Sequence, residues 1–144
     1  RATASASVDF ARLRGQLAPP VQGKLSARFG QRRALEGAGK APTWKGIFIQ
    51  AQEGTEVRAV AAGQVLFADW LRGFGNLIIL DHGDGFLSVY GNNEKLLRQN
   101  GESVQAGQAI ASVGNTGAHE QAGLYFEIRA NGQAIDPLKW VLLR

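Results

Sequence analysis

The sequence predicts a mainly β domain whose antiparallel strands form a sheet or a barrel-sandwich, with short helical pieces. Two observations support this prediction. From residue 44 onward, short runs with alternating or continuous apolar residues follow one another closely, as is typical of an antiparallel β fold. The chain also contains 19 glycines in 144 residues, and this high fraction favours a fold with many tight turns.

Length and composition are those of one domain that buries a core. The chain has 144 residues, of which 44% are hydrophobic, and this suffices for a single core. It contains no apolar run of the roughly 18 residues that a membrane-spanning helix needs. No signal peptide is recognisable, so we expect a mature or excised segment. The absence of cysteine excludes disulfides and thiolate metal sites.

Positive charge is concentrated in the N-terminal third. Residues 1–45 hold nine basic and two acidic residues, whereas residues 46–144 hold seven basic and ten acidic ones. Such a basic part suits contact with an anionic surface, and it equally suits a solubilising, flexible arm. Nucleic-acid binding is not favoured, because the basic residues lie in predicted loops and are not interleaved with aromatic residues along a strand.

Residues 1–16 are predicted to lead into the domain, which then extends over residues 17–144. Residues 1–7 are small and polar and are expected to be flexible. Residues 8–17 carry apolar side chains near helical spacing, as the last turns of an upstream helix would. The prolines at 19–20 end that helix.

The remaining elements follow from local patterns of apolar and turn residues. Gly- and Asp-rich stretches mark tight turns at 73–76, 81–85 and 131–132. The continuous apolar run 77–80 is typical of a strand that is buried on both faces. Residues 23–30 are predicted to form a short strand and a turn, residues 31–43 a polar loop, and residues 94–99 a short helix or turn. The other predicted elements are strands over 44–51, 57–59, 64–70, 77–80, 86–90, 103–104, 108–113, 123–130 and 134–135.

The strand over 123–130 has the clearest alternation. Its apolar residues Leu124, Phe126 and Ile128 alternate with other residues, and successive side chains of a strand point to opposite faces. We therefore expect the apolar set to face the core. The other set is expected to point outward or to line a groove, and it comprises Gly123, Tyr125, Glu127 and Arg129.

The segment Gly-Leu-Tyr-Phe-Glu at residues 123–127 resembles the His-Leu-His-Phe-Glu strand of LytM-type zinc endopeptidases, peptidase family M23, which cut peptidoglycan peptides. The resemblance covers roughly residues 17–144 and implies the duplicated-hybrid-motif barrel-sandwich of that family. A repeat agrees with it, since residues 54–65 and 101–110 share a Gly, a polar pair and Val, then Gly-Gln. Biotinyl and lipoyl carriers have the same half-motif, but they need a lysine at a hairpin tip, and residues 81–85 contain none.

The residues at the family's metal site are changed. The family binds one zinc through His, Asp and His and uses two further histidines in catalysis, and a catalytic zinc needs three such ligands. On this resemblance the ligand positions fall on Trp44, Phe48 and Tyr125, and the two catalytic histidines fall on Asn92 and Gly123. The resemblance therefore implies a domain without zinc, without another cofactor and without peptidase activity.

The two histidines of the chain, His82 and His119, lie at none of these positions. Both are predicted to be surface residues of turns. The alternative is a non-standard metal site that combines them with Asp84 and Glu127, in which case the domain would be a zinc endopeptidase.

The substrate groove of the family is predicted to become a partner-binding groove here. Strand parity places Phe48 opposite Ile47 and Ile49, on the outward face. Trp, Tyr and Arg supply much of the binding energy at protein interfaces, and exposed apolar patches usually mark partner sites. The alternative is that Phe48 and Tyr125 pack inward and fill the vacated metal cavity. The predicted groove consists of Trp44, Lys45, Phe48, Phe74, Leu77, Tyr90, Asn92, Tyr125 and Arg129.

The segments 45–46, 68–71, 88–92 and 124–129 together resemble the degenerate C-terminal LytM domains of murein hydrolase activators. This resemblance implies a periplasmic protein that acts at the division site of Gram-negative cells. Its partner would be an N-acetylmuramoyl-L-alanine amidase, whose autoinhibitory segment would bind in the groove. An upstream coiled coil would connect the protein to the FtsEX complex. A domain that only binds peptidoglycan is the alternative function.

Overall fold

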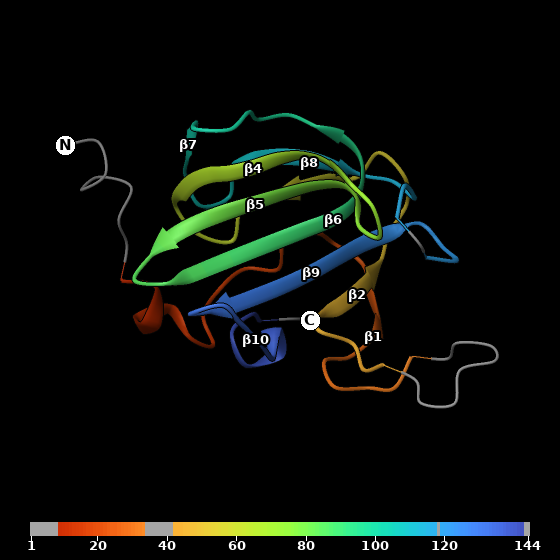
Figure 1. The fold of residues 1–144 in the computed structure, drawn as a ribbon, viewed down its shortest axis with the longest axis horizontal. Coiled ribbons are helices and arrows are strands. Elements are labelled where there is room, and N and C mark those ends of the chain that lie inside the picture. Colours follow the sequence, from red (N-terminus) through yellow and green to blue (C-terminus); the bar gives the residue numbers. More distant parts are fainter. Residues whose placement is uncertain (1–8, 34–41, 118, 143–144) are drawn as a thin grey trace.

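The computed structural model of the chain describes residues 9–33, 42–117 and 119–142 (Figure 1). The predicted flexible stretch 1–7 and most of the predicted loop 31–43 lie outside the described residues. The described strands join in one antiparallel sheet, which confirms the predicted mainly β class. The strands are β1 (Lys24–Ala27), β2 (Ile47–Gln50), β3 (Glu56–Arg58), β4 (Gly63–Leu71), β5 (Gly75–Gly83), β6 (Phe86–Leu96), β7 (Ser103–Val104), β8 (Ala109–Val113), β9 (Gly123–Ala130) and β10 (Gln133–Ile135).

The sheet places β9 in its interior. The strand order is β1-β2-β9-β6-β5-β4-β7. β10 pairs with the end of β9, on the same edge as β2, and β8 pairs with both β3 and the end of β6. Figure 1 shows the long strands β4, β5, β6 and β9 running side by side across the molecule. β9 is therefore flanked on one side by β2 and β10 and on the other by β6.

β5 and β6 are longer than the sequence predicts. β5 extends to Gly83, and β6 extends to Leu96 into the region 94–99, for which the sequence predicts a helix or turn. The end of β6 pairs with β8, since Lys95 lies opposite Ser112 and Leu96 opposite Ala111. This pairing joins residues far apart in the sequence, so the local pattern gives no sign of it.

The main core lies on one face of β9, as the alternation predicts. Leu124, Phe126 and Ile128 are fully buried and pack in one cluster with side chains from the other strands. That cluster includes Val57 of β3 and Ile110 of β8. The opposite face of β9 is thereby left for the second set of side chains.

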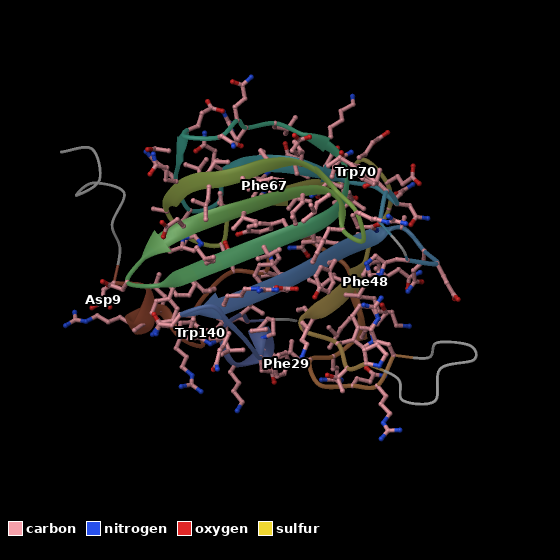
Figure 2. All side chains as sticks on the ribbon, viewed as in Figure 1. Asp9, Phe29, Phe48, Phe67, Trp70 and Trp140 are labelled. Atoms are coloured by element: carbon pink, nitrogen blue, oxygen red, sulfur yellow. The ribbon has the colours of Figure 1, made fainter. Side chains whose placement is uncertain are left out.

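Residues that the sequence assigns to the lead-in pack on the domain. A short 3-10 helix, η1 (Phe10–Leu13), buries Phe10 completely in the main core. The ring of Phe10 stacks on Trp140, with ring centres 5.0 Å apart. Figure 2 shows Trp140 and Phe48 at opposite ends of the long strands, so this packing lies away from the residues near Phe48.

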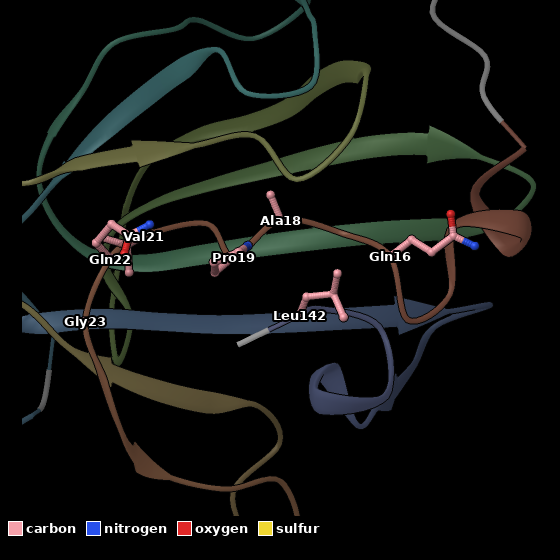
Figure 3. Close-up of a pocket in the computed structure, with 7 residues that line it drawn as sticks. All are labelled: Gln16, Ala18, Pro19, Val21, Gln22, Gly23 and Leu142. Atoms are coloured by element: carbon pink, nitrogen blue, oxygen red, sulfur yellow. The ribbon is translucent and has the colours of Figure 1, made fainter. Parts of the chain in front are cut away.

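The N-terminal and C-terminal segments of the domain lie side by side near Phe10 and Trp140. Leu17 forms a parallel bridge with Val141, which follows the second 3-10 helix, η2 (Pro137–Lys139). A pocket of about 330 Å³ lies between Leu142 and the chain from Gln16 to Gly23 (Figure 3). None of its lining residues belongs to the predicted groove.

A β-bulge in β6 changes the faces that its side chains occupy. Asn93 lies opposite Asn76 and Tyr90 opposite Ile78, so Gly91 and Asn92 together face a single residue of β5. Asn92 adopts a φ of 71°, in the left-handed region that Asn tolerates better than most residues. The simple alternation between Tyr90 and Asn92 is interrupted at this bulge.

Candidate functional site

Five ring side chains gather on the face of β9 that points away from the main core. We call them the aromatic cluster. The ring centre of His119 lies 4.6 Å from that of Phe48 and 5.6 Å from that of Trp44. Tyr125 lies 6.1 Å from Trp44 and 5.9 Å from Phe74. The aromatic cluster thus consists of Trp44, Phe48, Phe74, His119 and Tyr125.

The pairing of β2 with β9 builds the centre of the aromatic cluster. Phe48 and Tyr125 are direct cross-strand partners, whereas Ile47 and Ile49 point into the main core, as parity predicts. Trp44 is fixed just before β2 by a backbone hydrogen bond from its N–H to the carbonyl of Gln31, at 2.8 Å. Cross-strand aromatic pairs stabilise a sheet, so these residues support the fold as well as form a surface.

Phe48 and Tyr125 fill the position where the family's metal site is expected. Phe48 is 2% exposed and Tyr125 is 6% exposed. A Cβ atom placed on Gly123 would lie 2.6 Å from Cε2 of Phe48 and 2.5 Å from the carbonyl oxygen of Ile49. The Phe48 ring therefore occupies the space of a side chain at position 123. The sequence leaves open whether Phe48 and Tyr125 line an exposed groove or pack inward, and their burial corresponds to inward packing.

Trp44 and Phe74 are, with His119, the partly accessible rings of the aromatic cluster. Both are half-buried, and both pack against the buried rings of Phe48 and Tyr125. The guanidinium of Arg33 lies 4.3 Å from the centre of the Trp44 ring, within the range of a cation–π contact. The surface of the site is therefore aromatic with a basic edge.

His119 is not the free surface residue that the sequence suggests. Its ring stacks on Trp44 at an interplanar angle of 19°. Burial lowers the pKa of His119 to about 4, and the positive charge of Arg33 acts in the same direction. The neutral imidazole thus serves as one more ring of the aromatic cluster. No sequence pattern indicates this, because the contacts depend on how the loop before β9 folds back.

His82 is also buried, contrary to the prediction of a surface turn. β5 continues past it, and its ring stacks on Phe10 with centres 4.7 Å apart. Its Nδ1 lies 2.7 Å from the carbonyl oxygen of Ala62, and its Nε2 lies 2.6 Å from Oγ of Ser88. Burial lowers the pKa of His82. His82 therefore belongs to the main core, and His119 to the aromatic cluster.

A chain of polar side chains continues from the aromatic cluster along β9. The Tyr125 hydroxyl donates to Oε2 of Glu127, whose other oxygen, Oε1, accepts from Nε of Arg129 at 2.6 Å. Glu127 is buried, whereas the Arg129 side chain is 36% exposed. Burial and the nearby carboxylate raise the pKa of Tyr125, and the hydrogen bond to Glu127 raises the pKa of Arg129. Alternation along β9 predicts this shared face, although Glu127 is not among the predicted groove residues.

Tyr90 does not join the predicted groove. It is fully buried in the main core, and its hydroxyl accepts a hydrogen bond from the backbone N–H of Val60 at 3.1 Å. Burial raises the pKa of Tyr90. The expectation that Tyr90 shares the outward face is therefore wrong, because Tyr90 stands opposite Phe126, which faces the main core, and the bulge after Tyr90 separates its face from that of Asn92.

Asn92 has a structural role. Its Nδ2 donates to the carbonyls of Gly114 at 3.2 Å and Gly123 at 2.9 Å, and its Oδ1 accepts from the N–H of Gly117 at 2.7 Å. These bonds hold the loop that carries His119 against the start of β9. Leu77 is buried as well and lies beside Gly91 beneath the aromatic cluster. Asn92 and Leu77 therefore support the site from below.

An apolar row outside the predicted groove extends the site across the sheet. Phe67 of β4 lies opposite Ile79 of β5, which lies opposite Val89 of β6, which in turn lies opposite Glu127. Cross-strand partners share one face of a sheet. Phe67 and Ile79 are half-buried and belong to neither core cluster. The continuous apolar run over 77–80 is the signal that both faces of β5 carry apolar side chains.

The described residues offer no ready metal site. Over 9–33, 42–117 and 119–142, no three His, Cys, Asp or Glu side chains are grouped so that they could hold a metal ion. None of the helices described there is long and apolar enough to cross a membrane.

Comparison with known proteins relates the chain to cell-wall proteins. The profile of peptidase family M23 matches residues 42–137. The chain is 46% identical over 128 residues to the murein hydrolase activator EnvC of Escherichia coli, covering 89% of this chain and 29% of that protein. It is 41% identical over 123 residues to the murein hydrolase activator NlpD of Escherichia coli, covering 85% of this chain and 30% of that protein.

A solved structure shares the fold. A zinc-containing peptidase from Vibrio cholerae superimposes with a TM-score of 0.81 at 23% identity, over 90% of this chain and 41% of that one. Together with the family profile, this confirms the predicted LytM-type architecture. Since the chain spans less than a third of the length of the two activators, properties of those whole proteins do not follow for it from similarity alone.

Proposed function

The chain belongs to peptidase family M23, and we propose that it activates cell-wall hydrolases but has no peptidase activity of its own. Its similarity to two proteins named murein hydrolase activators supports the activator role. The partner that we propose is a periplasmic N-acetylmuramoyl-L-alanine amidase, in the cell envelope at the division site. An upstream coiled coil that reaches the FtsEX complex is part of the same proposal.

The side chains at the expected metal positions do not fit a zinc ion. Phe48 has no donor atom, and the indole N–H of Trp44 can only donate a hydrogen bond. The Tyr125 hydroxyl is already bound to Glu127, and burial keeps it protonated. The amide of Asn92 is committed to backbone groups, and Gly123 has no room for a side chain. These observations support a domain that does not carry out zinc-dependent hydrolysis.

The observation that carries the proposed activator role is the aromatic cluster, which lies at the positions that the resemblance assigns to the metal site and has the apolar row beside it. Half-buried aromatic and aliphatic side chains are anchors that protein segments bind, and arginine is common beside them. Such a surface suits an amphipathic segment that lays its apolar face on Trp44, Phe74 and Ile79.

The mechanism that we propose is allosteric. The surface binds the autoinhibitory segment of the amidase and holds it away from the amidase active site. A ligand shifts a conformational equilibrium only by its difference in affinity for the two states, so the domain must bind the released segment more tightly than the docked one. The contact therefore needs to be strong only in the open amidase.

A dye-release assay on labelled peptidoglycan tests this function. The three samples are the 144-residue chain alone, a periplasmic amidase of the same organism alone, and the two together. We expect label to be released only by the mixture. Release by the chain alone that stops on adding a chelator would mean that it is a metallopeptidase. Binding to sedimented peptidoglycan without any activation would support the passive peptidoglycan-binding domain instead.

A further inference from the structure

A pocket with two basic side chains adjoins the aromatic cluster. Its volume is about 380 Å³, and Arg129 and Lys45 are its charged lining residues. None of the described residues that line it is acidic. Within the described part of the chain, the ion pairs do not involve Lys45. The full lining consists of Phe29, Lys45, Arg129, Gly132, Gln133 and Ala134.

Close backbone packing brings the two basic residues to one pocket. A Cβ atom on Gly46 would clash with the carbonyl oxygen of Phe126 and would lie 2.8 Å from Cγ of Glu127. Because glycine lacks that atom, the chain before β2 lies directly on β9 at this point. Lys45 is thereby placed beside the outward face of β9, while β10 pairs with β9 at Arg129 and bounds the other side.

Arg129 is oriented before any ligand arrives. Glu127 engages only its Nε, at 2.6 Å, and the terminal nitrogens have no hydrogen-bond partner among the described residues. Glu127 is itself held by the Tyr125 hydroxyl and is buried. A guanidinium whose two terminal nitrogens are free presents a fork that matches the two oxygens of a carboxylate. The buried carboxylate thus fixes the donor without occupying the fork.

We infer that this pocket binds a carboxylate group, held between the terminal nitrogens of Arg129 and the ammonium group of Lys45. The inference rests on the proposed function for its source: the carboxylate belongs to an acidic side chain of the amidase segment that covers the aromatic cluster. An acidic protein side chain is favoured because the pocket and the aromatic cluster lie on one face of β9, within reach of one segment.

The geometry also sets the spacing within that segment. Tyr125 and Arg129 are four residues apart on β9, which is about 13 Å at the rise of a β-strand. A helix that lies along β9 covers this distance in about nine residues. The Asp or Glu therefore stands about nine residues from the apolar residue that lies over the aromatic cluster at the level of Tyr125.

The carboxylate site is tested first with acetate, without the amidase. The 144-residue chain is titrated with sodium acetate, with sodium chloride at equal ionic strength as reference, and its backbone amides are followed by NMR. We expect saturable shifts at Gly132 and Ala134. The double variant Lys45→Met, Arg129→Gln should weaken acetate binding about tenfold or more, since it removes two charged donors. The matched control, Lys24→Met with Lys139→Met, loses the same charge on exposed residues elsewhere and should bind acetate as before.

The second experiment tests the source of the carboxylate with the dye-release assay. The pocket variant should activate the amidase about tenfold less than the control variant. Acetate shifts that are absent, or equal in both double variants, would overturn the site. If the pocket variant loses acetate binding but activates the amidase fully, the assignment of the carboxylate to the amidase segment is overturned. The same holds if muropeptides compete with acetate for the unmodified chain and the amidase does not. If acetate binds but the unmodified chain activates no amidase, the proposed function fails and the carboxylate site stands.

Discussion

The ring of Phe48 lies where a side chain on Gly123 would have to be, with 2.6 Å between Cε2 of Phe48 and the position of a Cβ on residue 123. The two residues stand on neighbouring strands, so a change at one constrains the other. In the peptidases that the chain resembles, position 123 carries a histidine. Restoring that histidine alone cannot rebuild the peptidase site, because the ring and the backbone of β2 already occupy the space.

The first prediction concerns this crowding. Gly123→Ala should lower the free energy of unfolding by about 1–3 kcal/mol, the usual cost of forcing extra atoms into a packed interior. Urea denaturation measures it. Gly91→Ala is the matched control, because its nearest neighbour would be at 3.3 Å, and it should cost less. Equal stability of Gly123→Ala and the unmodified chain would contradict the packing of Phe48.

The second prediction concerns the accessible rings of the aromatic cluster. Trp44→Ala and Phe74→Ala should each reduce amidase activation by about tenfold or more, since interface aromatics are frequent hot spots. The dye-release assay measures this. Trp70→Ala is the control, because Trp70 is 56% exposed on β4 and lies outside the cluster. A loss of activation in the control as large as in the two cluster variants would argue against the site.

The third prediction concerns the hydroxyl of Tyr125. Tyr125→Phe should destabilise the fold by about 1–3 kcal/mol, because it leaves one oxygen of the buried Glu127 without its donor. Tyr125→Ala should cost more, since the ring itself is buried. Thermal unfolding of both variants provides the measurement, and a Tyr125→Phe variant as stable as the unmodified chain would exclude a role for this hydrogen bond.

The fourth prediction concerns the pH dependence of stability. The pKa of His119 is about 4 in the folded domain and 6.5 ordinarily, so the unfolded chain takes up a proton first as the pH falls. The contribution of the neutral ring is therefore complete above pH 6.5 and is lost between pH 6.5 and about 4. His119→Phe keeps a ring in place and should make the unfolding free energy less dependent on pH in this window.

The control for that comparison is His82, whose pKa is also lowered by burial and which remains in the variant. It accounts for the pH dependence that His119→Phe retains. If the unfolding free energy depends on pH equally in the variant and in the unmodified chain, His119 is exposed to water and does not pack among the rings. NMR of the imidazole gives a direct check, since the His119 signals should titrate at about pH 4.

The fifth prediction concerns the two tyrosines of the chain. Burial raises the pKa of both Tyr90 and Tyr125 above the ordinary 10.0, so both rings stay protonated in the folded domain well past that pH. Their stabilising contribution is complete below pH 10 and is lost as the pH rises further. Ultraviolet titration should show phenolate only when circular dichroism shows unfolding. Phenolate that appears near pH 10 in the folded domain would mean that one ring is exposed.

The faces of β2 and β9 follow from the sequence alone. In β2, Ile47 and Ile49 lie on one face and Phe48 on the other. In β9, Leu124 and Phe126 likewise lie opposite Tyr125. Successive side chains of a strand point to opposite faces, so the sequence alone assigns each residue to its face. The resemblance to the family, read from the same segments, implies which side chains stand at the positions of the metal ligands. Strand parity, the family and the aromatic character of the site are therefore predictable from the order of residues along the chain.

What lies on those faces depends on contacts between distant segments. Pairing with Phe126 directs Tyr90 into the main core, the bulge after it gives Asn92 a different face, and Asn92 holds the loop that carries His119 onto Phe48. Lys45 and Arg129 share a pocket only because Gly46 lets β9 approach. A local pattern specifies the direction of a side chain, whereas its neighbours depend on pairing register, bulges and loop closure, which link residues far apart in the chain.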